Sequence, residues 1–266
     1  MTAEPGPPPR LVASDIDGTL IRSDGTVSAR TVEVISRVEQ AGVPFVLVSG
    51  RPPRWMHEVA EALDHHGLAV CANGALVYDL HTERVVHEEP LDPATLREVV
   101  SALQAEVPEV RFAVEYGISR AQEAGYRSDW PSEVVEAAEL SEMLAQPAAK
   151  LLARHPRMTP DEFLALARKL VGDRVMLTHS STSALLEISA QGVTKATGLA
   201  NLAEERGITG DEVVAFGDMP NDLPLLAWAG RSYAVANAHP EVIEAADEVV
   251  PANDEDGVAQ VLERWF

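Results

Sequence analysis

The 266-residue chain has 21 Lys and Arg against 42 Asp and Glu, which gives a formal net charge of −21. A surface this acidic repels DNA, RNA and anionic lipid, so we expect neither nucleic acid nor a membrane as a partner. The single cysteine, Cys71, excludes an intramolecular disulfide, and no apolar run reaches the ~18 residues of a membrane span. The Pro-rich N-terminus has no apolar signal-peptide core. These features predict a cytoplasmic protein, and an anionic substrate would need a metal ion or a locally positive pocket.

The first part of the chain predicts strands and helices in alternation. Apolar strands are expected at residues 10–17, 43–51 and 68–79, the last with a turn at Asn73 and Gly74, and amphipathic helices at residues 28–42 and 54–64. The strands are almost continuously apolar. Such strands alternating with amphipathic helices favour a parallel sheet that is covered by helices on both faces.

The pattern changes between about residues 81 and 187, where helices mix with alternating, half-exposed strands. This mixture is typical of an α+β insert with a largely antiparallel sheet. The first pattern then resumes, with strands expected at 211–218 and 232–237 and helices at 194–207, 221–230, 239–250 and 257–266. The predicted fold class is α/β. A doubly wound, mostly parallel, Rossmann-like core of residues 1–80 and 188–266 is interrupted by an inserted α+β cap, residues 81–187.

Three of the predicted core strands end in polar, reactive side chains: Asp15 and Asp17, then Ser49, then Asp218. Ligands of open α/β sheets bind outside the carboxyl ends of the strands, so these groups should converge. Lys195 begins a predicted helix, where backbone N–H groups already favour an anion. Clustered carboxylates need a cation, and oxygen ligands suit Mg²⁺. Together these groups are suited to hold a phosphoryl group.

Four segments, "DIDGTL", "VSGR", "GVTKATGLANL" and "GDMPND", resemble the four motifs of the haloacid dehalogenase (HAD) superfamily phosphatases, in the same order and spacing. "NGALVYD", "AVANAHPEV" and "NDEDGVA" are similar to the Cof-type branch of that superfamily, whose members carry a C2B cap. The resemblance covers the core, whereas the insert matches only in length and position. It implies a Mg²⁺-dependent phosphatase that hydrolyses small phosphorylated metabolites, sugar phosphates or phosphorylated cofactors, through an aspartyl-phosphate.

The resemblance also implies roles for individual residues. Asp15 would attack phosphorus, and Asp17 would protonate the leaving group and then activate water. Ser49 and Lys195 would hold the phosphoryl oxygens and Asp15. The Mg²⁺ ligands would be the Asp15 carboxylate, the Asp17 backbone carbonyl and Asp218, with two more residues at or just behind them, Asn221 and Asp222. Residues expected to contact substrate are Gly18, Gly50, Arg51, Asn73, Gly74 and Asn221.

Two other functions remain open from the sequence. A phosphomutase or phosphotransferase of the same superfamily would pass the phosphoryl group to a sugar hydroxyl instead of water. A phospho-accepting signalling module also uses an Asp, Mg²⁺ and a Lys on a doubly wound sheet, but it needs no acid such as Asp17 and no large cap. We expect the four tryptophans to pack rather than to form a stacking platform, although Trp130 lies where it could reach substrate.

Overall fold

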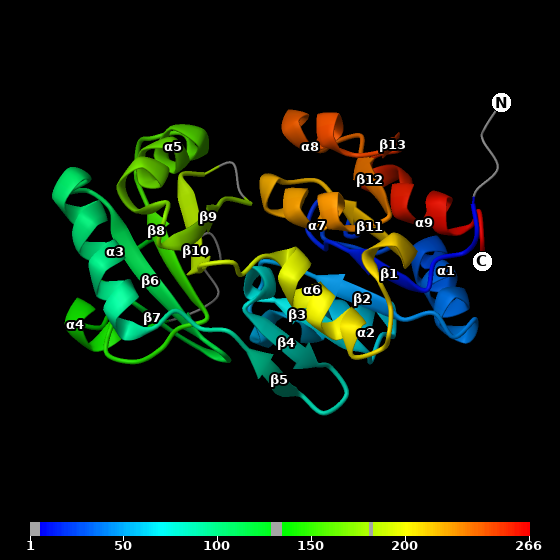
Figure 1. Cartoon of the computed structure of the whole chain (residues 1–266), viewed down its shortest axis with the longest axis horizontal. Helices are drawn as coiled ribbons and strands as arrows, with labels where there is room; N and C mark the ends of the chain where they lie inside the picture. Colours follow the sequence, from blue (N-terminus) through cyan, green and yellow to red (C-terminus); the bar gives the residue numbers. More distant parts are fainter. Residues whose placement is uncertain (1–5, 129–134, 181–182) are drawn as a thin grey trace.

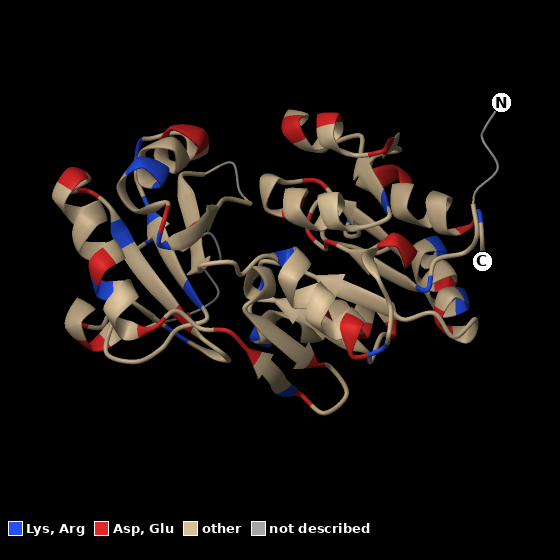
Figure 2. Cartoon of the chain, in the orientation of Figure 1, with Lys and Arg blue, Asp and Glu red and all other residues tan. Residues whose placement is uncertain are grey.

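The computed structural model describes residues 6–128, 135–180 and 183–266, and it places two β-sheets in two parts of the molecule (Figure 1). Trp130 lies outside the described residues. The first described residues and the C-terminus lie beside the larger sheet, at the side remote from the smaller one. Asp and Glu are distributed over both parts (Figure 2), as the net charge of −21 requires.

The larger sheet has eight strands in the order β13-β12-β11-β1-β2-β3-β4-β5. Pairing is parallel from β13 to β3 and antiparallel from β3 to β5, which confirms the mostly parallel sheet. All four residues of β1 and of β2 are buried, so helices cover both faces of the sheet there. The strands are β1 Leu11–Ser14, β2 Phe45–Val48, β3 Leu68–Cys71, β4 Leu76–Asp79, β5 Arg84–Glu88, β11 Val213–Gly217, β12 Arg231–Val235 and β13 Glu248–Val250.

The helices of this part form two packed groups, in which α1 contacts α2 and α9, whereas α7 contacts α6 and α8. Ser28 caps the first helix as expected, because its side chain accepts a hydrogen bond from the Thr31 N–H. The helices are α1 Ala29–Gln40, α2 His57–Leu63, α6 Lys195–Glu204, α7 Leu223–Trp228, α8 Pro240–Ala245 and α9 Gly257–Leu262. Short 3₁₀ turns are η1 Pro53–Trp55, η2 Ala72–Gly74, η3 Gly210–Glu212, η4 Pro220–Asp222 and η5 Asn253–Glu255.

The smaller sheet has five strands in the order β7-β6-β8-β10-β9, and every pairing in it is antiparallel. Its helices pack on a hydrophobic cluster of their own, so an antiparallel α+β unit is present where the sequence predicted one. The strands are β6 Arg111–Tyr116, β7 Ser119–Gln122, β8 Lys150–Arg154, β9 Val175–Thr178 and β10 Leu185–Ala190. The helices are α3 Pro93–Glu106, α4 Leu140–Met143 and α5 Pro160–Val171.

Three details differ from the sequence-based expectation. Strand β5 was assigned to the insert that starts at residue 81, but it pairs with β4 and so extends the larger sheet. Strand β10 continues past residue 187 to Ala190. Residues 239–250 were expected to form one helix, but α8 ends at Ala245 and β13 pairs with β12. The β-branched Val249 and Val250 favour a strand at the open edge of a sheet.

Candidate active site

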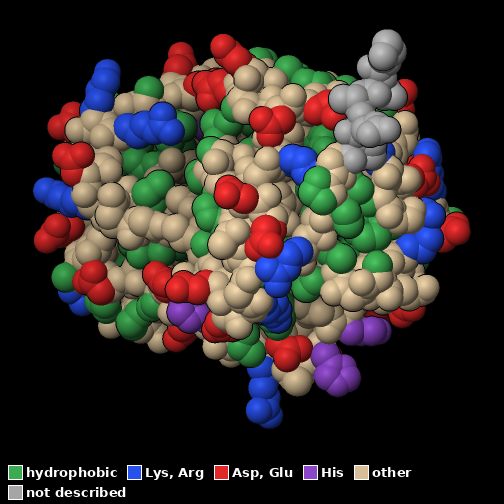
Figure 3. Space-filling view, turned by 45° about the vertical axis from the view of Figure 1, so that its right-hand side comes forward, with side chains coloured by type: hydrophobic (Ala, Val, Ile, Leu, Met, Phe, Trp, Pro, Cys, Tyr) green, Lys and Arg blue, Asp and Glu red, His purple; other side chains and the backbone are tan. Residues whose placement is uncertain are grey.

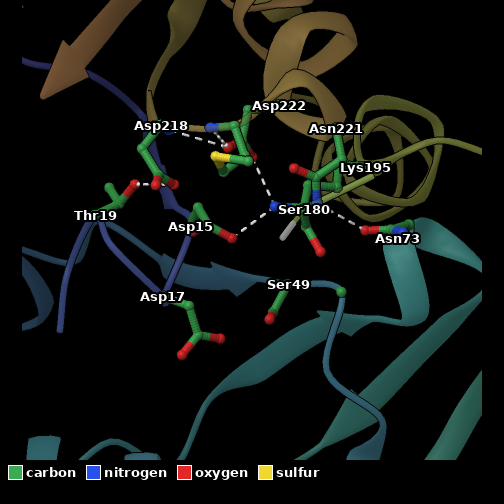
Figure 4. A network of polar contacts seen from close by, with 12 residues as sticks. Asp15, Asp17, Thr19, Ser49, Asn73, Ser180, Lys195, Asp218, Asn221 and Asp222 are labelled. Carbon is green, nitrogen blue, oxygen red and sulfur yellow. Dashed lines mark hydrogen bonds and ion pairs between the residues drawn. The ribbon is translucent and has the colours of Figure 1, made fainter. Parts of the chain in front are cut away.

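The order of the strands brings the predicted reactive groups together. Strand β1 lies between β11 and β2, so Asp15, Ser49 and Asp218, which follow these three strands, meet at one edge of the sheet (Figure 4). The Asp15 N–H donates to the Phe216 carbonyl at 3.0 Å, which continues the pairing with β11 past the end of β1. The convergence expected from the sequence is therefore present.

Lys195 is the central cation of this cluster and is completely buried. Thr194 caps α6, which fixes the backbone at Lys195. The Lys195 Nζ donates to Asp15 Oδ1 and to Asp222 Oδ1, each at 2.6 Å. Burial alone would lower the pKa of Lys195, but the two carboxylates raise it above its ordinary value, so the ammonium group stays charged.

We expect Lys195→Met to lower the free energy of unfolding by ~3–5 kcal/mol at neutral pH, because two buried carboxylates lose their counter-charge. The deficit should shrink as the pH falls and those carboxylates take up protons. Urea denaturation at pH 7.5 and pH 5 measures both effects. Lys169→Met, at an exposed position of α5, is the matched control. Equal stability of the Lys195 and Lys169 variants at pH 7.5 would contradict the assigned ion pairs.

Three buried carboxylates, Asp15, Asp218 and Asp222, have oxygen atoms within 4.8 Å of one another. Burial, with repulsion from Asp222 and Asp218, raises the pKa of Asp15 well above its ordinary value. Burial and Asp222 raise the pKa of Asp218 to about 7. This cluster has three carboxylates and one buried lysine, and a bound cation would offset the remaining negative charge.

The three carboxylates are not equally free to bind a cation. Asp222 already binds Lys195 through Oδ1, and its Oδ2 accepts from the N–H groups of Asp218 and Met219, both at 3.0 Å. Asp218 Oδ1 accepts from the Thr19 hydroxyl at 3.0 Å, whereas Oδ2 faces Gly18, where a Cβ atom would lie 2.4 Å away. Asp15 and Asp218 are thus the better cation ligands, and Gly18 is required for space.

Asn221 adds an oxygen to this site. Its Nδ2 donates to Asn73 Oδ1 at 3.1 Å, and its buried Oδ1 has no hydrogen-bond partner among the described residues. In Figure 4 this oxygen lies on the side of Lys195 and away from Asn73. A buried amide oxygen without a donor is suited to bind a cation or a water molecule on that cation.

Asp17 has a different environment from Asp15. Its side chain is half exposed and forms a two-point ion pair with Arg51, with Nη2···Oδ1 at 2.5 Å and Nε···Oδ2 at 2.7 Å. Strand β1 ends at Ser14, so strand alternation does not set the direction of these two carboxylates, but both line the same cavity. No sequence pattern indicated the pairing of Asp17 with Arg51.

That cavity has a volume of about 500 Å³ and lies between the two parts of the molecule. From the larger part it is lined by the predicted Asp15, Asp17, Ser49, Gly50, Arg51 and Asn221. From the smaller sheet and its loops come residues that no motif predicted: Arg120, Tyr126, Lys150, Leu152, Arg154 and Glu187. The motifs therefore predicted residues that line one wall of the cavity, whereas pattern reasoning missed the opposite wall.

The guanidinium carbons of Arg120 and Arg154 lie 5.3 and 5.8 Å from the centre of the Tyr126 ring. Burial raises the pKa of Tyr126 to about 12, so its hydroxyl stays neutral. The alternation of charged and apolar residues along β6 to β8 is the only sequence signal for this wall, and it does not say which residues face a cavity.

Gly18, Asn73 and Gly74 were expected to contact substrate, but none of the three is among the described residues that line the cavity. Asn73 and Gly74 have positive φ angles, of 58° and 103°. A Cβ on Gly74 would lie 1.9 Å from the Thr194 carbonyl oxygen. The turn instead packs against the start of α6, where it supports Lys195.

The fold and site define a class of protein: an α/β protein in which three buried carboxylates and a lysine gather at the carboxyl edge of a mostly parallel sheet. A family described as haloacid dehalogenase-like hydrolase matches residues 12–262. The chain belongs to this family and is a phosphoric monoester hydrolase. Among the described residues, no helix is both long and apolar enough to cross a membrane.

Relatives cover almost the whole chain. It is 29% identical to a putative phosphatase of Haemophilus influenzae, over 97% of this chain and 98% of the relative. It is 25% identical to the pyridoxal phosphate phosphatase YbhA of Escherichia coli, over 95% and 97% of the two chains. The structure of the subclass IIB sugar phosphatase BT4131 has the same fold, with a TM-score of 0.83, 19% identity and coverage of 95% and 97%.

Proposed function

We propose that the protein is a Mg²⁺-dependent phosphatase that hydrolyses small phosphorylated metabolites through an aspartyl-phosphate on Asp15. The observation that carries this proposal is the Asp15 carboxylate, buried at the end of β1, held by Lys195 and still lining the cavity. A carboxylate held in one orientation beside a cavity is suited to attack phosphorus.

In the first step an Asp15 oxygen forms a bond to phosphorus while the bond from phosphorus to the leaving oxygen breaks. Lys195 orients Asp15 and offsets the charge on the phosphoryl oxygens. The Ser49 hydroxyl accepts from the Arg51 N–H at 3.0 Å, so its own proton remains for a phosphoryl oxygen. The leaving oxygen takes a proton from Asp17.

In the second step a water molecule gives a proton to Asp17 and its oxygen attacks phosphorus, which frees Asp15 and releases phosphate. Arg51 binds Asp17 in this structure. A substrate anion that takes over the Arg51 guanidinium would release the Asp17 side chain for both proton transfers. Asp17 is therefore proposed as the acid and base, and Arg51 as the residue that couples substrate entry to it.

The residues proposed to hold Mg²⁺ are the carboxylates of Asp15 and Asp218, the Asp17 backbone carbonyl, and Asn221 and Asp222 at or just behind them. The buried cluster, the raised pKa values and the unpartnered Asn221 oxygen support a hard divalent cation. Bound there, the ion would neutralise the cluster and polarise the phosphoryl group.

The proposed division places residues 1–80 and 188–266, together with strand β5, in a catalytic core and the rest of residues 81–187 in a C2B-type cap that selects substrate. The cavity between the two sheets supports this division, since the smaller sheet supplies Arg120, Tyr126 and Arg154. The names of two relatives, a pyridoxal phosphate phosphatase and a sugar phosphatase, support small phosphorylated metabolites as substrates. The acidic charge and single cysteine support a cytoplasmic location.

The test is phosphate release from p-nitrophenyl phosphate and from a panel of sugar phosphates and phosphorylated cofactors, ranked by kcat/KM. Release that needs Mg²⁺ is expected. Radiolabel that moves mainly to a second sugar would instead favour a phosphotransferase. A long-lived phosphorylated protein without turnover would favour a signalling module, a reading that the nearly complete burial of Asp15 disfavours.

We expect Asp17→Asn to lower kcat by about 10²–10⁴-fold, the usual contribution of a positioned acid and base. The loss in kcat/KM, which reports the first step alone, should be larger for an alkyl phosphate than for p-nitrophenyl phosphate, because nitrophenolate leaves without a proton. Steady-state kinetics with both substrates measure this difference. Arg51→Lys, which keeps a charge beside Asp17, is the companion variant. An equal loss for both leaving groups would contradict the acid role.

A further inference from the structure

A chain of buried hydrogen bonds runs from the smaller sheet to the carboxylate cluster. Lys150 Nζ donates to Glu187 Oε2 at 2.6 Å and to the Gly50 carbonyl at 2.5 Å. Asn73 Nδ2 donates to the same Glu187 oxygen at 2.8 Å, and Asn221 Nδ2 donates to Asn73 Oδ1 at 3.1 Å. Glu187, Lys150, Asn73 and Asn221 are each no more than 5% exposed, so water does not compete for these contacts.

Lys150, at one end of this series of hydrogen bonds, determines which group donates in each of them. Lys150 has donors only, so the Glu187 oxygen that it binds must act as an acceptor. Asn73 must then present its NH₂ group to that oxygen, which turns its carbonyl oxygen toward Asn221. Asn221 must present its own NH₂ group in turn, and its carbonyl oxygen is left on the other side. The orphaned Asn221 oxygen is thus a consequence of Glu187 and Lys150.

We propose that Glu187 is a positioning residue that fixes the amide orientation of Asn221 through Asn73 and so keeps an oxygen, not an NH₂ group, facing the cation site. This inference rests on the proposed function, since it assigns Asn221 to the surroundings of the proposed metal ion. If the Asn221 amide turned over, it would present two N–H donors to a cation, and binding would weaken.

The close packing around Gly50 helps to hold these hydrogen-bonded side chains in one orientation. A Cβ on Gly50 would lie 3.1 Å from both Asn73 Oδ1 and Glu187 Oε2, so this loop packs tightly against both side chains. Ser180 also donates to Glu187 Oε1. The smaller sheet therefore has a second role besides lining the cavity. Its Glu187 determines whether the oxygen or the NH₂ group of Asn221 faces the proposed cation site.

The experiment compares Glu187→Gln with Glu187→Met. Gln keeps an oxygen acceptor for Lys150 and Asn73, whereas Met has a similar length and no acceptor. Because Glu187→Met leaves the Lys150 charge buried without its carboxylate and the variant could fail to fold, Glu187→Met/Lys150→Met removes both charges together. Mn²⁺ binding is followed by electron paramagnetic resonance on metal-free protein, alongside thermal melting and the Mg²⁺ dependence of phosphate release.

Both Met variants are expected to weaken Mn²⁺ binding about 10-fold or more, and Gln to weaken it less than about 3-fold. In an Asn221→Leu background, Glu187→Met should add no further loss, because the effect passes through Asn221. Wild-type Mn²⁺ affinity in the folded double variant, or an equal loss with Gln and Met, would overturn the relay. Absence of Mn²⁺ binding by the unmodified protein would instead overturn the proposed metal site itself.

Discussion

Asp15→Asn is expected to lower kcat for p-nitrophenyl phosphate by about 10⁴-fold or more, since loss of a covalent nucleophile removes the main route of the reaction. An amide cannot form the aspartyl-phosphate, and Lys195 loses one of its two carboxylate partners at the same position. The measurement is single-turnover and steady-state kinetics. Asp211→Asn, at an exposed position of η3, is the matched control and should retain wild-type turnover.

The Asp15→Asn variant should not lose stability. This result would separate a catalytic role of Asp15 from a structural one. Burial raises the pKa of Asp15, so in the folded protein without metal the ionised carboxylate is less favourable than it is in the unfolded chain. Stability from this group is therefore greatest at low pH and decreases as the pH rises toward neutrality. Asn resembles the protonated carboxyl, so Tm measured in EDTA at pH 7.5 should equal or exceed the wild-type value. A large fall in Tm, or full turnover, would contradict the assigned role of Asp15.

The wall of the cavity that carries Asp15, Asp17 and Ser49 could be predicted from sequence, because these side chains directly follow buried strands. An apolar run that ends in Asp15 or Asp218 predicts both the strand and the edge at which the side chain emerges, and parallel pairing then brings these edges together. The position of Lys195 followed in the same way from the capped start of α6. The course of the backbone alone places these residues at the site. Their positions could therefore be predicted without knowing any side-chain contact.

The remaining features depend on contacts between segments far apart in the chain. The Asp17–Arg51 pair joins loops after β1 and β2, and Asn73 proved to bind Glu187, 114 positions away, instead of lining the cavity. Local patterning carries no information on such partners. Strand β13 was missed for a related reason, since only the open edge of β12 makes a strand of three residues favourable.

The acidic surface adds a constraint on the substrate. Acidic and basic side chains are interspersed over the face that Figure 3 presents, while the net charge of the chain is −21. A phosphorylated substrate therefore approaches against a repulsive field, and attraction must come from within the cavity. The positive side chains that line the cavity among the described residues are Arg51, Arg120, Lys150 and Arg154, and the proposed metal ion would add to them. Substrate affinity should consequently increase with salt concentration, because salt screens the repulsive surface charges more than it screens the charges inside the cavity.

Removal of divalent metal with EDTA should abolish phosphate release, and added Mg²⁺ should restore it. Asp218→Asn should raise the Mg²⁺ concentration for half-maximal activity by about 100-fold, because the cluster loses the negative charge of one of the two carboxylates best placed to bind a cation. Mn²⁺ binding to metal-free protein provides the readout that does not depend on turnover. Asp211→Asn again serves as the control. Full activity in EDTA would contradict the metal site.

The pH dependence of this metal requirement follows from the same residue. Burial and Asp222 raise the pKa of Asp218 to about 7 in the metal-free protein. Below that pH a proton occupies the carboxylate, and a cation must displace it to bind. The half-saturating Mg²⁺ concentration should therefore increase as the pH falls through 7 toward 6. In Asp218→Asn, which has no proton to displace at this position, the increase should be smaller, although Asp15 would still contribute. An unchanged pH dependence in this variant would show that Asp218 is not the group that competes with the metal for a proton.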